Sequence, residues 1–171
     1  MINNKMEKAI NGQINAEIYS SYLYLSMSAY FESVNLKGCS NWMRMQAMEE
    51  LAHFKKFYDY LIARGGTIVL SQIEAPPAKW KSPLAVFENV LKHEQKVTSL
   101  INNLVDISLK LKDHATNGFL QWFVSEQVEE EATADEIIQS MKLNKDNPSG
   151  LFMIDKELAQ RVFVPPAGVT L

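Results

Sequence analysis

The stretch MQAMEELAHFKKFYDYL, residues 45–61, has the hydrophobic period of a buried helix but carries polar side chains on its apolar face. Residues spaced alternately three and four apart share one face of an α-helix, and a helical bundle buries that face. Here the face starts at Met43, just before this stretch, and continues with Gln46, Glu50, His53, Phe57 and Tyr60. A single Glu-x-x-His pair is a weak indication of a metal site, so its meaning depends on the rest of the chain.

Three other tracts have the same kind of face, each with an acid near its centre. Their members are Ile10, Ile14, Glu17, Ser21, Tyr24, Ser28 and Phe31; Leu84, Phe87, Leu91, Glu94, Thr98, Ile101 and Val105; and Leu120, Phe123, Gln127, Glu130, Ala134, Ile137 and Met141. The chain therefore places polar groups inside four apolar stripes.

The spacing of these polar residues repeats between the two halves of the chain. Glu17 stands 33 and 36 residues before the two members of the Glu-x-x-His pair, and Glu94 stands 33 and 36 residues before Gln127 and Glu130. With turns near residues 35 and 112, the members of each half lie at the same depth. We therefore expect all six side chains to converge in one layer of a bundle.

The positions of proline and glycine divide the chain. Prolines occur only at 76, 77, 83, 148, 165 and 166. One proline-free tract runs from about residue 3 to Arg64, with a turn at 34–38, and stops at Gly65-Gly66, a helix-ending signal. The other runs from Ser82-Pro83, a helix-starting signal, to residue 147, with a break at 112–114 and Asp113 as a candidate cap. These features predict an all-α fold of four helices of roughly 27 residues each.

The segment between the two tracts is too long for a tight turn. Residues 65–81 could reach ~55 Å when extended, whereas a helix of about 27 residues is ~40 Å long. We therefore expect a long crossover that makes the second and third helices parallel. A short fifth helix is expected around residues 151–160, so that residues 1–160 form the bundle domain and residues 161–171 an irregular C-terminal tail.

The composition excludes several classes of protein. The chain has 171 residues, a hydrophobic content of 47%, a net charge of −3 and a pI near 5.6, which argues against nucleic acid as a partner. We expect no signal peptide, and no run of apolar residues is long enough to predict a membrane span. The one cysteine, Cys39, can form neither an internal disulfide nor a cysteine metal site. A cytoplasmic location is expected.

Buried carboxylates that converge would repel one another and take up protons unless a cation lies among them. No Lys or Arg occupies the centre of any of the four stripes; the nearest basic residue on them, Arg64, lies three turns away. Carboxylates with one histidine suit iron, manganese or zinc rather than thiophilic metals. The pattern therefore predicts a buried metal centre, and glutamates that bridge the two hairpins would hold two ions.

This pattern resembles the ferritin-like di-iron carboxylate bundles, in particular the bacterial and archaeal non-haem ferritins, over essentially the whole chain. The similarity is carried by Glu17, NAEIYSSYLYLSMSAYF, MQAMEELAHFKKFYDYL, Glu94 and SEQVEEE. Such bundles generally combine a Glu from each of two helices with Glu-x-x-His from each of the other two. Here Gln127-x-x-Glu130 replaces the second Glu-x-x-His, which makes a bacterioferritin or a rubrerythrin less fitting. With Leu51 where bacterioferritins have a haem-ligating Met, the resemblance implies no haem.

By this resemblance, Glu17, Glu50 and His53 would bind one iron, and Glu94, Glu130 and a bridging Glu50 the second. Gln127 matches the glutamine beside such centres. Tyr24, two turns after Glu17, matches a tyrosine that hydrogen-bonds a ligand carboxylate and could donate an electron; the alternative is an ordinary core tyrosine.

The acidic run SEQVEEEATADE, residues 125–136, has two interpretations. Such runs are usually a solvated face. The resemblance instead implies that Glu126 and Glu129, with Glu49, form a third iron site beside the pair. We expect Glu131, Asp135 and Glu136 to be solvated, His93 to lie on the surface, and Trp122 to pack in the core.

The implied function is iron storage and detoxification. Fe(II) would be oxidised by O2, or by hydrogen peroxide, at a ferroxidase centre and stored as a mineral inside a shell of 24 identical chains. Two alternatives remain open: a bundle that buffers iron or zinc without turnover, and a di-iron oxygenase acting on an organic substrate.

Overall fold

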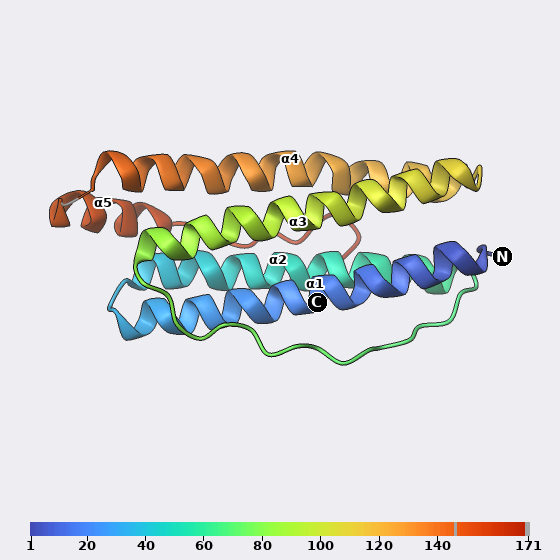
Figure 1. Cartoon of the computed structure of the whole chain (residues 1–171), viewed down its shortest axis with the longest axis horizontal. Helices are drawn as coiled ribbons and strands as arrows, with labels where there is room; N and C mark the ends of the chain where they lie inside the picture. Colours follow the sequence, from blue (N-terminus) through green and yellow to red (C-terminus); the bar gives the residue numbers. More distant parts are fainter. Residues whose placement is uncertain (146, 170–171) are drawn as a thin grey trace.

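The structure is a computed structural model that describes residues 1–145 and 147–169. Its helices are α1 (Asn4–Ser33), α2 (Lys37–Ala63), α3 (Pro83–Lys110), α4 (His114–Leu143) and α5 (Pro148–Leu158), and no strand occurs in these residues. The first four helices lie side by side as a bundle, and α5 packs across one end of it (Figure 1). The predicted all-α class, the long crossover and the short fifth helix are confirmed.

Most helix boundaries follow from the predicted signals. The Ser82 hydroxyl accepts a hydrogen bond from the backbone N–H of Ala85 at 3.1 Å, and the Asp113 carboxylate accepts one from Thr116 at 3.1 Å. Gly65, with φ of 72°, takes the left-handed conformation that ends α2. There are two exceptions. Helix α2 begins at Lys37, inside the predicted turn at 34–38, and α5 begins at Pro148 and ends at Leu158 rather than spanning 151–160. Proline in the first turn of a helix loses no hydrogen bond, so α5 starts earlier than we predicted.

The crossover between α2 and α3 runs back along the length of the bundle beside α1 (Figure 1). Two asparagines of α1 hold it through its backbone. The Asn11 side chain donates to the Thr67 carbonyl at 2.9 Å and accepts from the Val69 N–H at 2.8 Å, while Asn15 donates to the Ser71 carbonyl at 3.3 Å. These bonds satisfy backbone groups that have no partner of their own in an extended segment. Because the crossover returns to the end of the bundle where α2 began, α2 and α3 run parallel (Figure 1).

The apolar core is divided into two clusters along the bundle axis. The cluster toward α5 includes Phe31, Trp42 and Phe87, and the cluster toward the N-terminus includes Phe57 and Phe123. Each buried side chain of this size stabilises the fold by roughly 1.5–3 kcal/mol. The layer between the clusters is buried too, but its side chains are polar.

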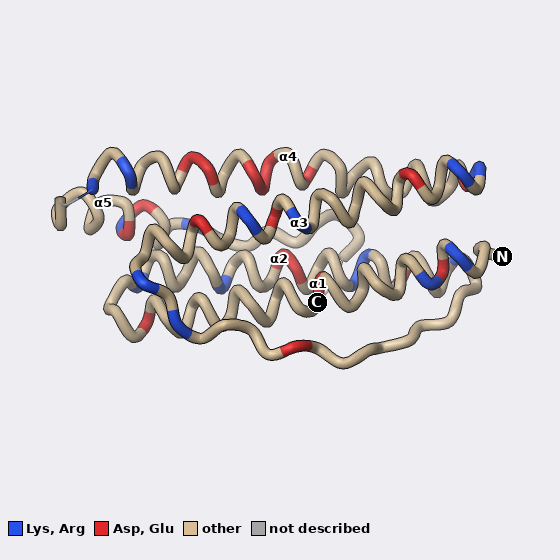
Figure 2. Tube along the Cα trace, viewed as in Figure 1, with Lys and Arg blue, Asp and Glu red and all other residues tan. Residues whose placement is uncertain are grey.

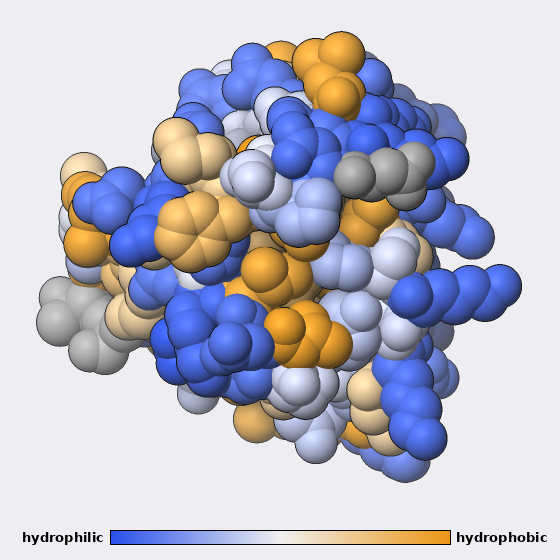
Figure 3. Space-filling view, turned by 90° about the vertical axis from the view of Figure 1, so that its left-hand side faces the viewer, coloured by the Kyte–Doolittle hydropathy of each residue, from blue (hydrophilic) through white to orange (hydrophobic). Residues whose placement is uncertain are grey.

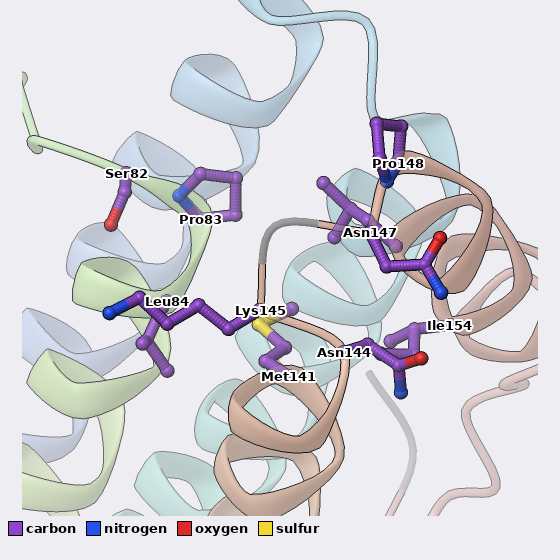
Figure 4. A pocket seen from close by; sticks show the side chains of 10 residues that line it. Ser82, Pro83, Leu84, Met141, Asn144, Lys145, Asn147, Pro148 and Ile154 are labelled. Atoms are coloured by element: carbon purple, nitrogen blue, oxygen red, sulfur yellow. The ribbon is translucent and has the colours of Figure 1, made fainter.

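The surface of the bundle is uneven in charge and polarity. Acidic residues gather along the middle of α4, with lysines near its C-terminal end and around the α3–α4 turn that precedes it (Figure 2). The end that carries α5 shows apolar side chains among hydrophilic ones (Figure 3), and Phe152 and Met153 of α5 are exposed. A pocket at this end lies between Pro83, Met141 and Ile154, away from the polar layer (Figure 4). In the described part of the chain, no helix has the length and apolar character that crossing a membrane requires.

Candidate metal centre

The first hairpin, α1–α2, brings three potential metal ligands together. One ligand atom each of Glu17, Glu50 and His53 lies within 4.8 Å of the others, and the three residues are only 1%, 2% and 4% exposed. Gln13, one turn before Glu17, donates a hydrogen bond to its Oε1 at 2.8 Å. The Oε2 atoms of Glu17 and Glu50 are buried and accept no hydrogen bond, and Glu50 Oε2 lies 3.5 Å from His53 Nδ1. A buried carboxylate oxygen without a partner is costly, and a cation between these oxygens would compensate for it.

The second hairpin, α3–α4, places its carboxylates opposite but ties them to protein groups. The Tyr24 hydroxyl donates a hydrogen bond to Oε1 of the buried Glu94, and the Gln127 amide donates to its Oε2 at 3.3 Å. The Gln46 amide donates to Oε2 of Glu130 at 2.7 Å. These carboxylates are therefore oriented before any metal arrives, by partners from both hairpins.

Burial and mutual repulsion raise the pKa values of these acids. Burial raises the pKa of Glu17 to about 8, and the charge of Glu50 adds to the effect. Burial is also the main reason why the pKa of Glu50 is raised, followed by the charges of Glu94 and Glu130 from the other hairpin. Glu94 and Glu130 have pKa values raised by burial to about 7 and about 8. Without metal, this layer therefore retains protons near neutral pH, and a divalent cation would displace them.

The three acids expected at a third site lie outside the compact group of Glu17, Glu50 and His53. Glu49 is half-buried and forms an ion pair with Arg161 of the C-terminal tail. Glu126 is half-buried and Glu129 exposed. Burial raises the pKa of Glu49 and the charge of Glu126 raises it further, while the charge of Glu129 acts on Glu126 in the same way. Among the described residues, the ligand atoms that lie within 4.8 Å of one another belong to Glu17, Glu50 and His53, so the structure does not gather Glu49, Glu126 and Glu129 in the same way.

The rest of the acidic run is mostly solvated. Asp135 and Glu136 are exposed, as predicted. Glu131 differs from the prediction, because it is half-buried and accepts a hydrogen bond from the Thr98 hydroxyl. Thr98 lies on the buried stripe of α3, and α4 brings Glu131 within its reach.

The prediction for His93 is wrong. His93 is 8% exposed, its Nε2 lies 2.8 Å from the Ser20 hydroxyl, and burial lowers its pKa to about 4. A residue next to the buried stripe faces solvent only if no helix packs there, and α1 covers this side of α3. Trp122 is half-buried and packs against the N-terminal cluster, with its ring 5.4 Å from that of His53.

Three residues that touch the acids were not predicted as members of the site. Gln13 and Gln46 each lie one turn before a predicted ligand, and Gln46 is on the buried stripe itself, so helical spacing could have identified both. Arg161 carried no such signal, because it belongs to an irregular segment more than 100 residues away from Glu49.

Together, the fold and this layer define a four-helix bundle with a buried, carboxylate-rich centre suited to divalent metal ions.

The comparisons with known proteins specify the family. The ferritin-like domain family matches residues 7–144. The chain is 48% identical over 161 residues to a bacterial non-heme ferritin of Bacteroides fragilis, covering 94% of this chain and all of the relative, and 38% identical over 159 residues to one of Escherichia coli, covering 93% and 96%. An engineered closed form of the Archaeoglobus fulgidus ferritin superimposes with a TM-score of 0.95 at 52% identity, covering 96% of this chain and all of that one. The chain therefore belongs to the ferritin family, whose members store iron.

Proposed function

We propose that this chain oxidises Fe(II) with O2 at the buried layer and stores the product as Fe(III) mineral. The observation that carries the proposal is the group formed by Glu17, Glu50 and His53, with two unpartnered carboxylate oxygens. These residues would bind the first iron, and Glu94, Glu130 and a bridging Glu50 the second. Each Fe(II) gives up one electron to O2. Because Fe(III) is the harder ion, a site made largely of carboxylates favours the oxidised state.

The hydrogen-bonded partners would position the ligands of the second iron. Tyr24 and Gln127 hold the two oxygens of Glu94, and Gln46 holds Glu130. Outer partners of this kind fix ligand orientation in metal sites generally. Tyr24 lies in contact with a ligand carboxylate, which also suits the role of an electron donor. Gln127 lies at the edge of the centre, where its amide could bind water or oxygen species.

Glu49, Glu126 and Glu129 would form a third, weaker iron site. The half-buried and exposed positions of these acids support this role, since weakly held ligands near solvent let an ion leave. Their place beside Glu50 and Glu130 would give iron a route out of the buried layer. The third site thus connects oxidation to storage.

Storage needs a cavity, and we propose that identical chains, 24 in number, enclose one in the cytoplasm. Tyr22 and Leu25 of α1, together with Val128 of α4 and Phe152 of α5, are large apolar side chains that remain between 48% and 69% exposed. Further copies of the chain would cover them. The similar Archaeoglobus fulgidus protein is an open-pore ferritin, which supports an assembly of several chains here.

The deciding experiment is aerobic loading of the metal-free protein with a large excess of Fe(II), followed by sizing with iron and protein detected together. We expect most of the iron to elute with a particle far larger than one chain, and O2 to be consumed. Tight binding without O2 consumption would favour a metal-buffering bundle instead. A small protein carrying only two or three irons would refute storage and return attention to an oxygenase.

A further inference from the structure

Arg161, three residues beyond the end of α5, attaches the C-terminal tail to α2. Its guanidinium forms an ion pair with Glu49 through Nη2, and its central carbon lies over the Trp42 ring, 4.4 Å from the ring centre. The Asn41 side chain donates a hydrogen bond to the Arg161 carbonyl at 3.0 Å. The side chain of Arg161 is 21% exposed and that of Glu49 is 24% exposed. The contact is therefore largely protected from water, which strengthens it relative to a surface ion pair.

The tail beyond Arg161 is held less firmly. It turns back from α5 along the bundle (Figure 1), and Ala167, Gly168 and Val169 reach the neighbourhood of Lys56 on α2. Val162 and Val164 are more than 75% exposed. Among the described residues, the hydrogen bond found within 162–169 is the one from the Val169 N–H to the Pro166 carbonyl. Arg161 is thus the charged anchor of an otherwise loosely packed segment.

The anchor lies beside the predicted metal centre. Glu49, the partner of Arg161, directly precedes the predicted ligand Glu50 on α2. The guanidinium also has an unmet requirement, because its Nη1 is buried without a hydrogen-bond partner. Arg161 therefore places one positive charge beside Glu49, while one of its own nitrogens lacks a hydrogen bond.

We propose that Arg161 is a built-in cation that competes with metal for Glu49. In the metal-free chain it neutralises this acid, and a metal ion at Glu49, Glu126 and Glu129 must displace it. This inference depends on the part of the proposed function that places a third metal site at these acids. The coupling is reciprocal: Arg161 weakens metal binding at Glu49, and a bound metal weakens the attachment of the tail by the same free energy. The tail would then loosen as the third site fills, and close again as the ion moves on.

Zinc titration of the metal-free protein tests the competition without oxidation. In Arg161→Gln, the weakest class of Zn²⁺ sites should bind about tenfold more tightly than in the parent, within the usual range of coupling between sites, and the tighter sites should not change. Arg161→Lys should lie close to the parent, because it keeps the charge. Arg44→Gln, an exposed arginine on the same helix as Glu49, should match the parent. Adding Glu129→Gln to Arg161→Gln should remove the gain.

Either of two results would overturn the proposal. Weaker binding in Arg161→Gln would mean that arginine organises Glu49 for metal instead of opposing it. Only two zinc ions per chain in both parent and variant would mean that no metal competes at Glu49. Neither result tests the proposed two-iron centre in the buried layer. If that centre were wrong, the tight zinc sites or the O2 consumption would be missing.

The fluorescence of Trp42 provides a second measurement. It would not respond to zinc through Arg161 if this arginine had only a structural role. In a chain with Trp80→Phe and Trp122→Phe, Trp42 is the remaining tryptophan. Filling the weakest zinc sites should change its fluorescence, because the guanidinium leaves its ring. The change should be absent when Arg161→Gln is added. Equal fluorescence changes with and without Arg161 would contradict displacement.

Discussion

The two helical hairpins carry the same polar spacing but prepare their acids in different ways. In α1–α2, Glu17 and Glu50 each keep a buried oxygen without a partner, beside His53. In α3–α4, the oxygens of Glu94 and one oxygen of Glu130 are hydrogen-bonded. Equal spacing therefore places the acids at equal depth in the bundle. The neighbouring side chains decide how many carboxylate oxygens remain without a hydrogen bond. The first hairpin is therefore the half of the proposed centre in which a cation would compensate the most buried charge.

Removing a ligand of the first hairpin should have the largest effect. In Glu50→Ala or His53→Ala, Fe(II) oxidation should slow by at least about 100-fold, since loss of a mere outer partner already costs about 10–100-fold in metal sites. Stopped-flow absorbance after aerobic mixing with two Fe(II) per chain measures this. Glu136→Ala, an exposed acid on α4, is the control. If both variants oxidise iron as fast as the control, the metal centre lies elsewhere.

Loss of a hydrogen bond in the second hairpin should have an intermediate effect. Tyr24→Phe removes the donor to Glu94 Oε1 and should slow oxidation by about tenfold while both tight metal sites remain. Oxidation kinetics and zinc stoichiometry measure the two consequences. An unchanged rate would assign Tyr24 to core packing alone.

The acids of the proposed third site, Glu49, Glu126 and Glu129, should influence the number of bound ions more than the rate of oxidation. Glu129→Ala should remove one rapidly bound ion per chain and alter product release, with an initial rate close to that of the parent. Stoichiometric Fe(II) titration followed by repeated additions measures both. A large drop in the initial rate would mean that Glu129 belongs to the two-iron centre. It would then contradict a separate third site.

The protonated acids should make the stability of the metal-free protein depend on pH. Glu17 and Glu130 have folded pKa values of about 8, above their ordinary 4.5, so the folded chain retains protons that the unfolded chain has lost. Their contribution is fully present below pH 4.5 and is lost as the pH rises toward and through 8. Thermal melting should therefore show a falling Tm over this range, reversed by bound zinc. A Tm that rises over the range would contradict the buried, proton-bearing state.

The smallest effect is expected beside the second hairpin. Ser20→Ala removes the hydrogen bond to His93 Nε2 and should lower stability by about 1 kcal/mol, which is roughly 2–4 °C in Tm for a chain of this size. Oxidation should be unchanged, because neither residue touches the acids' oxygens. Ser99→Ala, an exposed serine of α3, is the matched control. A strong effect on oxidation would link His93 to the centre.

Much of the fold could be predicted because its signals are local. Ser82, Gly65 and Asp113 act within a few residues of their own positions, so the helix ends follow from them. The early start of α5 at Pro148 was missed because a proline followed by Ser and Gly is also typical of a loop. The sequence of α3 does not show which helix packs against its second side. For that reason His93 was predicted at the surface, although it is buried.

The sequence by itself determined that the chain forms long helices and that Glu17, Glu50, His53, Glu94, Gln127 and Glu130 share one layer, since helical period and matched spacing set depth along a helix. The tertiary structure decided which of these oxygens remain unpartnered and which are held by Tyr24, Gln127 and Gln46. It also decided that Arg161 meets Glu49. Hydrogen bonds and ion pairs between distant segments depend on side-chain directions in the packed state, and spacing along one helix carries no information about them.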